Sequence, residues 1–331
     1  MTAQPTSVTI TSGDCRAIIA TRGAGPASLT LKGQDLLEGY EVTGKSAEAP
    51  FFANLVLAPW PNRTDGAAFE FAGEHHELEL TEPGKNTALH GLVADRVWTV
   101  VSGGEGTDAP DTPDTSDTVE LELSVADEPG WPWPFHLSVT YRVTGTGLEA
   151  SFAMRNDAEE PMPAACGFHL YPSALGAPTD TCTLTLPEHR VLPLDARGLP
   201  SGPEQDDPAD PADTADSAVL PERDNPLAGT LLDHCLYPVP GGTPPQFVLR
   251  RPDGAGVALT TSAELSWFQI FTPDAAAGMP YPGRPGGRAV AVEPMTAPPD
   301  ALNSGADLDV LQPGESLRCS WRLDAVPERR R

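Results

Sequence analysis

The sequence has few basic residues, and this shortage limits its partners. Lysine and arginine together number 21, against 47 aspartates and glutamates, which gives a formal net charge of −26. Nucleic acids and anionic membranes attract proteins through basic surface. We therefore expect neither nucleic acid nor a membrane as a partner, and we attribute the acidity to solubility.

Cysteine is also scarce, and its spacing fits neither a disulfide framework nor a structural zinc site. The five cysteines are an odd number and contain no Cys-x-x-Cys pair. Four of them lie in apolar or strand-like stretches: Cys166, Cys182, Cys235 and Cys319. We predict that these thiols are reduced and lie in the core or near a site of a cytoplasmic protein.

Long apolar runs and the common cofactor motifs are absent as well. No stretch approaches the ~18 apolar residues that a membrane-spanning helix requires, and the first residues lack the pattern of an export signal. The sequence contains no Gly-x-Ser-x-Gly elbow, phosphate loop, dinucleotide fingerprint or His-Glu-x-x-His spacing. We therefore expect an intracellular protein without a bound metal.

What the sequence does contain is an alternation of apolar and polar residues with a period of two. It is clearest at 119–125, 135–143 and 148–154, and two shorter runs, 69–71 and 78–80, flank a turn near 72–74. No segment shows an amphipathic helical repeat, and 37 prolines and 31 glycines separate the short strands. This pattern predicts an all-β protein, a sandwich or barrel forming one large antiparallel domain over residues 1–331.

Two segments depart from this alternation. Residues 103–118 and 201–218 are acidic, repetitive and poor in apolar residues. Because strand patterns resume on both sides of each, we interpret them as flexible loops inserted between strands rather than as linkers between domains.

The most informative stretch surrounds Glu293. An apolar run precedes this carboxylate, and prolines at 294, 298 and 299 follow it. Because proline cannot continue a hydrogen-bonded ladder, we predict that the strand ends here. A carboxyl partly screened from water has a raised pKa, which suits proton transfer. The alternative is an ordinary capping or ion-paired glutamate.

Two of the seven histidines have similar surroundings. His90 and His169 each follow small or apolar residues and precede a chain breaker, as expected where a strand passes into a loop. Imidazole is well suited to donating or accepting a proton near neutrality, although a histidine in such a place is more often structural. We leave out His75 and His76, expected in a hairpin turn, as well as the strand-edge histidines His136 and His189.

Further polar residues occupy predicted strand ends. Asn62 and Arg63 follow an apolar strand, and the Arg63 guanidinium could bind sugar hydroxyls or a carboxylate, or simply form a surface ion pair. Asp233 lies in an apolar stretch, where a carboxylate requires partners. Four tryptophans could offer flat faces to a sugar ring, although we expect half of them in the core: Trp60, Trp131, Trp133 and Trp267.

Together these residues resemble the aldose 1-epimerase family, also called galactose mutarotases. The matching segments follow the order of the family: Asn62-Arg63 with Asp65-Gly66, residues 86–93 with Leu-His-Gly-Leu, Gly167-Phe168-His169-Leu170-Tyr171, Leu232-Asp233-His234, residues 291–303 with Glu-Pro-Met-Thr-Ala-Pro-Pro, and Leu311-Gln312-Pro313-Gly314-Glu315. The resemblance covers about residues 8–325. The usual His-Pro-Tyr of the family is His-Leu-Tyr here.

The resemblance implies a large antiparallel β-supersandwich with a sugar cleft, and interconversion of the α and β anomers of free aldohexoses without a cofactor. It also implies that Glu293 is the base at the anomeric hydroxyl and His169 the acid at the ring oxygen. Substrate contacts would come from His90, Asp233, Arg63 and Asn62.

Three other functions remain open from the sequence. The same scaffold could be a non-catalytic sugar-binding or regulatory protein. A hexose-phosphate mutarotase would need extra cations, to which Arg284 and Arg288 could contribute. A glycosidase with Asp233 and Glu293 as its paired carboxylates ranks last. The preferred aldose, the oligomeric state and the pathway are left open.

Overall fold

The computed structural model describes residues 6–42, 49–103, 117–126, 128–202, 225–238 and 245–328. Strands dominate these residues, which contain one short α-helix, α1 (Ala301–Ser304), and the 3-10 turns η1 (Pro50–Phe52), η2 (Thr179–Thr181) and η3 (Pro285–Gly287). The predicted all-β class is therefore confirmed. Among the described residues, no helix is both long enough and apolar enough to cross a bilayer.

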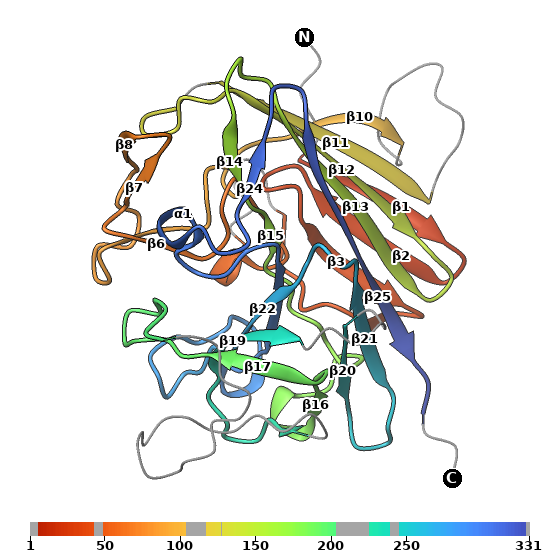
Figure 1. The fold of residues 1–331 in the computed structure, drawn as a ribbon. Coiled ribbons are helices and arrows are strands. Elements are labelled where there is room, and N and C mark those ends of the chain that lie inside the picture. Colours follow the sequence, from red (N-terminus) through yellow and green to blue (C-terminus); the bar gives the residue numbers. More distant parts are fainter. Residues whose placement is uncertain are drawn as a thin grey trace.

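The largest sheet has nine antiparallel strands, and we call it the large sheet (Figure 1). In spatial order they are β10 (Thr99–Gly103), β11 (Thr118–Val125), β12 (Phe135–Val143), β13 (Gly147–Asn156), β25 (Ser316–Val326), β21 (Gly256–Thr261), β20 (Gln246–Arg250), β16 (Thr183–Thr185) and β18 (Asn225–Pro226). The strands predicted from alternation at 119–125, 135–143 and 148–154 are its β11, β12 and β13. The C-terminal strand β25 pairs with both β13 and β21, which joins distant parts of the chain.

A second sheet, of six antiparallel strands, carries the candidate residues, and we call it the site sheet. Its order is β17 (His189–Leu192), β19 (Asp233–Pro238), β22 (Trp267–Phe271), β23 (Ala291–Met295), β15 (Gly167–Phe168) and β5 (Val56–Leu57). A four-stranded N-terminal sheet contains β1 (Ser7–Ser12), β2 (Cys15–Ala20), β3 (Pro26–Leu31) and β4 (Gln34–Asp35). Three strand pairs complete the fold: β14 (Met162–Ala164) with β24 (Asp309–Leu311), β6 (Arg63–Asp65) with β9 (Thr87–Leu89), and β7 (Ala68–Phe71) with β8 (Glu74–Glu77).

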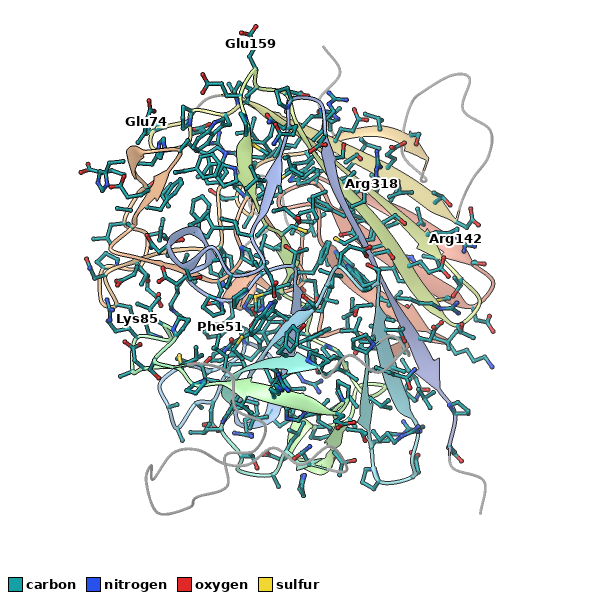
Figure 2. The ribbon with its side chains drawn as sticks, in the orientation of Figure 1. Phe51, Glu74, Lys85, Arg142, Glu159 and Arg318 are labelled. Carbon is teal, nitrogen blue, oxygen red and sulfur yellow. The ribbon has the colours of Figure 1, made fainter. Side chains whose placement is uncertain are left out.

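One apolar cluster draws residues from Val8 to Leu323 and connects the sheets. Alternate residues of β11, β12 and β13 enter it, because successive side chains of a strand point to opposite faces. Each fully buried valine, leucine or phenylalanine contributes about 1.5–3 kcal/mol relative to exposure. Figure 2 shows the complementary pattern, with charged side chains such as Glu74, Arg142 and Glu159 pointing outward from the rim.

Two expectations about aromatic residues were wrong. All four tryptophans considered for sugar stacking are buried, and Trp131 packs edge-on against Trp133 at 5.3 Å between ring centroids. Tryptophan has so much apolar surface that burial outweighs exposure on a sheet face. The turn of the β7–β8 hairpin occupies residues 72–73, so His75 and His76 lie on β8 itself, and His76 is buried.

The cysteine prediction is confirmed, because all five thiols are free and buried. The predicted acidic insertions, 103–118 and 201–218, lie mostly outside the described residues. What is described of the first is its flanks, the end of β10 and the start of β11, which pair with each other. The second falls between β17 and β18.

The fold predicts that Leu137→Ala is strongly destabilising. Leu137 is fully buried at the centre of β12, and its truncation should lower the free energy of unfolding by about 2–5 kcal/mol. The measurement is urea unfolding followed by tryptophan fluorescence. Ser138→Ala, on the opposite face of the same strand, is the control and should stay within about 0.5 kcal/mol of the wild type. Equal midpoints for Leu137→Ala and the wild type would contradict the core assignment.

Candidate active site

The strands β22 and β23 of the site sheet are buried on both faces, and the two faces differ in their neighbours. Gln269 lies directly opposite Glu293 across β22 and β23, and Ile270 lies opposite Val292. Ile270 and Val292 join the main core, so by strand alternation Gln269 and Glu293 point to the other face. Glu293 is therefore carried by a strand, β23, whose opposite face packs in the main core.

The predicted strand end at Glu293 was wrong, because Glu293 is in the middle of β23. The amides of Val292 and Thr296 donate to the carbonyls of Leu170 and Cys166, on the β15 side of the strand. Pro294 lies between them on that same edge and has no amide to donate. Only a hydrogen bond toward β15 is lost, and pairing with β22 continues through Pro294 to Met295.

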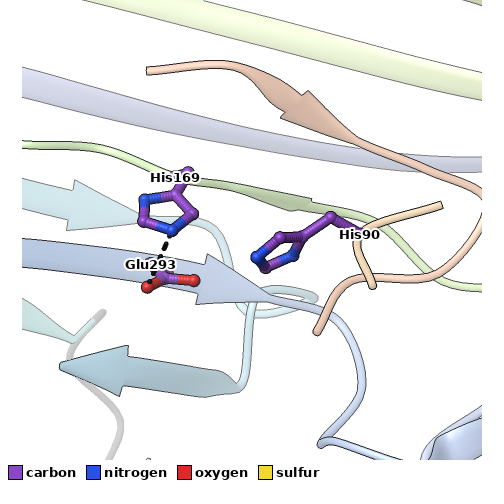
Figure 3. Close-up of side chains that lie close together, drawn as sticks. All are labelled: His90, His169 and Glu293. Atoms are coloured by element: carbon purple, nitrogen blue, oxygen red, sulfur yellow. Dashed lines mark ion pairs between the residues drawn. The ribbon is translucent and has the colours of Figure 1, made fainter. Parts of the chain in front are cut away.

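Glu293 contacts His169, although 124 residues separate them along the chain. His169 directly follows β15, and its backbone is held by hydrogen bonds to Asn54 and Leu55. Its Nε2 lies 3.3 Å from Glu293 Oε1, with side-chain exposures of only 6% and 3% (Figure 3). An imidazole and a carboxyl thus meet in a place that water barely reaches.

Burial pushes both members of this pair toward their neutral forms. It lowers the pKa of His169 to about 3, and the nearby Arg63 guanidinium acts in the same direction. Burial raises the pKa of Glu293 well above the usual carboxyl range, with Asp233 adding to the effect and Arg63 opposing it. Both shifts favour a pair that holds one proton in total, since neither an unpaired imidazolium nor an unpaired carboxylate is favoured in this site.

His90 joins this pair from the turn after β9. Its ring centroid is 5.3 Å from that of His169. One ring nitrogen of His90, one of His169 and one carboxyl oxygen of Glu293 lie within 4.8 Å of one another (Figure 3). Phe52 packs edge-on against the His90 ring at 4.8 Å. These contacts bring together three residues that the sequence had singled out separately.

A reciprocal pair of hydrogen bonds holds His90 against Asn62. The backbone amide of Asn62 donates to His90 Nδ1 at 3.1 Å, and the backbone amide of His90 donates to the backbone carbonyl of Asn62 at 2.9 Å. Both residues have left-handed backbones, with φ of 56° and 62°, a strained geometry that clusters at functional sites. Gly91 must be glycine, because a Cβ there would lie 2.1 Å from the Ala58 carbonyl oxygen.

The hydrogen bond from Asn62 also determines which nitrogen of His90 carries a proton. Burial lowers the pKa of His90 well below its usual value, with His169 and Arg63 adding to the effect. A neutral imidazole that accepts at Nδ1 carries its proton on Nε2. His90 therefore presents an N–H donor, which suits a sugar hydroxyl and weighs against metal ligation through this residue.

Arg63 begins β6 rather than following a strand, and it is not a surface residue. Its guanidinium donates two hydrogen bonds to the Glu82 carboxylate, from Nε to Oε2 at 2.7 Å and from Nη2 to Oε1 at 3.1 Å. Gly198 packs against it so closely that a Cβ would lie 2.6 Å from Arg63 Nη1. The bidentate pairing fixes the guanidinium where its charge acts on His169 and Glu293.

Gln269 is the polar residue that the sequence reasoning missed. Its Nε2 donates to Asp233 Oδ1 at 2.5 Å, and its Oε1 accepts from Asn62 Nδ2 at 3.5 Å. Asp233 begins β19 and is exposed, so the expectation that burial would force partners on this carboxylate was wrong, although the Gln269 amide does donate to it. The available signal was a glutamine within the apolar run Trp267–Phe271, since a buried amide needs partners.

The antiparallel sheets of the described residues have the galactose mutarotase-like fold. Solved structures agree: the chain superposes on the GalM/aldose epimerase homologue of C. elegans with a TM-score of 0.78, at 18% identity over 98% of this chain and 99% of the other. A galactose mutarotase-like protein of Clostridium acetobutylicum gives 0.75, at 18% identity over 96% and 94%. At these identities the likeness concerns the fold.

Sequence comparison identifies the family. The family model for aldose 1-epimerase matches residues 6–323, and this chain belongs to that family. The uncharacterized protein YihR of Escherichia coli (strain K12) is 28% identical over 322 residues, which covers 96% of this chain and 92% of YihR. The resemblance noted in the sequence is therefore confirmed at the level of the family.

The hydrogen bond between Asn62 and His90 predicts one tautomer for His90. Long-range ¹H–¹⁵N spectra should show the proton on Nε2, with no conversion to imidazolium across roughly pH 5–8. His90→Gln identifies the signals. A proton on Nδ1, or an imidazolium in that range, would contradict the geometry described above.

Proposed function

We propose that this protein is an aldose 1-epimerase that interconverts the α and β anomers of free aldohexoses. The observation that carries the proposal is the buried 3.3 Å contact between His169 Nε2 and Glu293 Oε1. Anomer exchange requires one group that removes a proton and one that supplies a proton at neighbouring oxygens of the same sugar. A paired imidazole and carboxyl meet this requirement without a cofactor.

In the proposed reaction, the contact between the two side chains gives way to contacts with the sugar. Glu293 accepts the proton of the anomeric hydroxyl while His169 donates a proton to the ring oxygen, so the bond from C1 to that oxygen breaks. Rotation about C1–C2 turns the other face of the aldehyde toward the chain, and the roles reverse on closure. Each positioned proton transfer contributes typically ~10²–10⁴-fold in rate.

The single proton of the pair is consistent with these roles. Neutral imidazole with carboxylic acid, and imidazolium with carboxylate, contain the same number of protons and differ by one transfer between Nε2 and Oε1. Burial favours the first form in the free site. The reactive form, imidazolium with carboxylate, is reached without proton exchange with solvent. The hydroxyls of the bound sugar stabilise its charges through hydrogen bonds, as water would outside the site.

The remaining candidate residues would bind and orient the sugar. His90 offers its Nε2–H to a hydroxyl, and Asp233 offers acceptor oxygens beside the Gln269 amide. Arg63 and Asn62 hold this arrangement through Glu82 and Gln269, and the Arg63 charge also favours an ionised Glu293.

The contacts of the two candidate phosphate-binding cations do not favour a hexose-phosphate mutarotase. Arg284 Nε lies 3.0 Å from Glu38 Oε2, and Arg288 is paired with Asp180 and Asp274. Carboxyl groups already hold both guanidinium groups, so neither is free to bind a phosphate. A non-catalytic sugar-binding protein is separated from the enzyme by the first experiment below.

Glu293→Gln should lower kcat by about 10²–10⁴-fold, because an amide cannot accept the hydroxyl proton, and should change KM little. The measurement is polarimetry or NMR exchange on freshly dissolved α-glucose and α-galactose. Glu264→Gln, an exposed glutamate with the same chemical change, is the matched control and should keep wild-type activity. Retained activity in Glu293→Gln would remove it from the base role, and a folded wild type without activity on any aldose would refute the enzyme.

The shared proton also predicts the pH dependence. A second, inactivating proton reaches the pair only near the lowered pKa of His169, about 3, and the last proton leaves only above the raised pKa of Glu293. Lowering the pH through 6.5, where an ordinary histidine gains its proton, should therefore leave kcat/KM unchanged after subtraction of buffer catalysis. An acid limb with an apparent pKa near 6.5 would show that His169 titrates as a solvated group.

A further inference from the structure

A second buried polar cluster lies beside the histidine–glutamate pair. It consists of Tyr40, Tyr171, Tyr281 and the ion pair between Glu38 and Arg284, and we call it the tyrosine cluster. The three phenol hydroxyls are buried, and none has a hydrogen-bond partner among the described residues. Glu38 is buried as well, with its Oε2 3.0 Å from Arg284 Nε. No role assigned so far uses these groups.

The tyrosine cluster is continuous with the proposed catalytic pair. The Tyr171 ring stacks on the His169 ring, with centroids 5.3 Å apart and planes 15° apart. The Tyr281 ring follows at 4.9 Å from Tyr171. Tyr171 also accepts the amide hydrogen of Glu38 at its carbonyl oxygen, at 2.8 Å. His169, Tyr171 and Tyr281 thus form an unbroken row of rings that begins at the proposed catalytic pair.

The turn η1, from another part of the chain, contacts both the histidines of the candidate active site and the tyrosine cluster. Phe52 packs against His90 and His169, and the next ring along, Phe51, stacks on Tyr281 at 6.3 Å. Figure 2 shows Phe51 toward the centre of the view, away from the charged rim. Both phenylalanines have positive φ, 49° and 56°. Phenylalanine rarely adopts this backbone, and such strain clusters at ligand sites.

Three unpartnered hydroxyls in one place indicate a missing partner. Buried hydroxyls are nearly always hydrogen-bonded, and leaving one unsatisfied costs about 1–3 kcal/mol. Tyr141 differs from these three, since its buried hydroxyl donates to the Ala24 carbonyl at 2.7 Å. The tyrosine cluster thus offers three hydroxyls, close together and next to His169, to a hydrogen-bonding ligand.

We propose that the tyrosine cluster is a specificity subsite for the exocyclic hydroxymethyl group of an aldohexose. The inference rests on the proposed function, in which His169 acts at the ring oxygen. The exocyclic group is carried by C5, which is bonded to that oxygen, so this substituent lies on the His169 side of the sugar. The row of rings from His169 to Tyr281 leads from there to the unpartnered hydroxyls.

The charges of the cluster favour a neutral hydroxyl over an anion. A phosphate would meet the Glu38 carboxyl group as well as the Arg284 guanidinium. Burial raises the pKa of Glu38 to about 7, with Arg284 acting in the opposite direction. This carboxyl can therefore donate to or accept from a hydroxyl near neutrality.

The test compares glucose with xylose, a pentose with the same ring hydroxyls and no hydroxymethyl group. Tyr281→Phe should lower kcat/KM for glucose by about 5–10-fold, as expected for one lost hydrogen bond, and leave xylose within about twofold. Tyr141→Phe is the matched control: it removes a buried phenol hydroxyl that already has a partner, the Ala24 carbonyl, and should leave the glucose-to-xylose ratio unchanged.

Equal losses on both sugars, or no loss on glucose, would overturn the subsite. A preference of the wild type for glucose 6-phosphate over glucose would overturn the neutral-hydroxyl assignment. Equilibrium binding of glucose and xylose to the wild type and Tyr281→Phe, by calorimetry, separates the two proposals. If mutarotation is absent, the proposed function fails. The subsite is then supported if Tyr281→Phe weakens the binding of glucose but not of xylose, and it is overturned if both are affected equally or neither is affected.

Discussion

The site depends on holding one acid and one base together and out of water. A single buried charge costs several kcal/mol, so Glu293 and His169 can be buried at 3.3 Å only as a pair without net charge. One proton shared between them satisfies this condition in either of its positions. The same constraint that makes the pair tolerable in the fold thus suits it to the two proton transfers of the proposed reaction.

The rest of the fold supplies the dry and rigid surroundings that this pair requires. The strand β23 directs Val292 into the main core and Glu293 to the other face, so packing on one side determines the position of the carboxyl on the other. His90 is held by a strained turn against Asn62, and Arg63 by its two hydrogen bonds to Glu82. The side chains around the pair therefore have little freedom to relax when a proton moves.

Much of this could be predicted from the sequence, for identifiable reasons. The strands β11, β12 and β13 could be predicted because a half-buried strand repeats with a period of two, and the turn at His90-Gly91 because glycine permits close approach of the backbone. The strand end at Glu293 was wrong because the cost of a proline depends on which neighbouring strand its missing amide faces. Gln269 and the tyrosine cluster were missed because the residues around them come from remote segments of the chain.

By itself the sequence determined the β class, the buried free cysteines and the small set of residues able to transfer protons, since alternation and side-chain chemistry are local properties. Only the tertiary structure decided which of those residues meet. Strand order placed β23 between β22 and β15, and this order brought Glu293, Gln269 and His169 together. Burial, a property of the whole fold, then shifted the pKa values of Glu293 and His169, because the free energy of a charge depends on everything that displaces water around it.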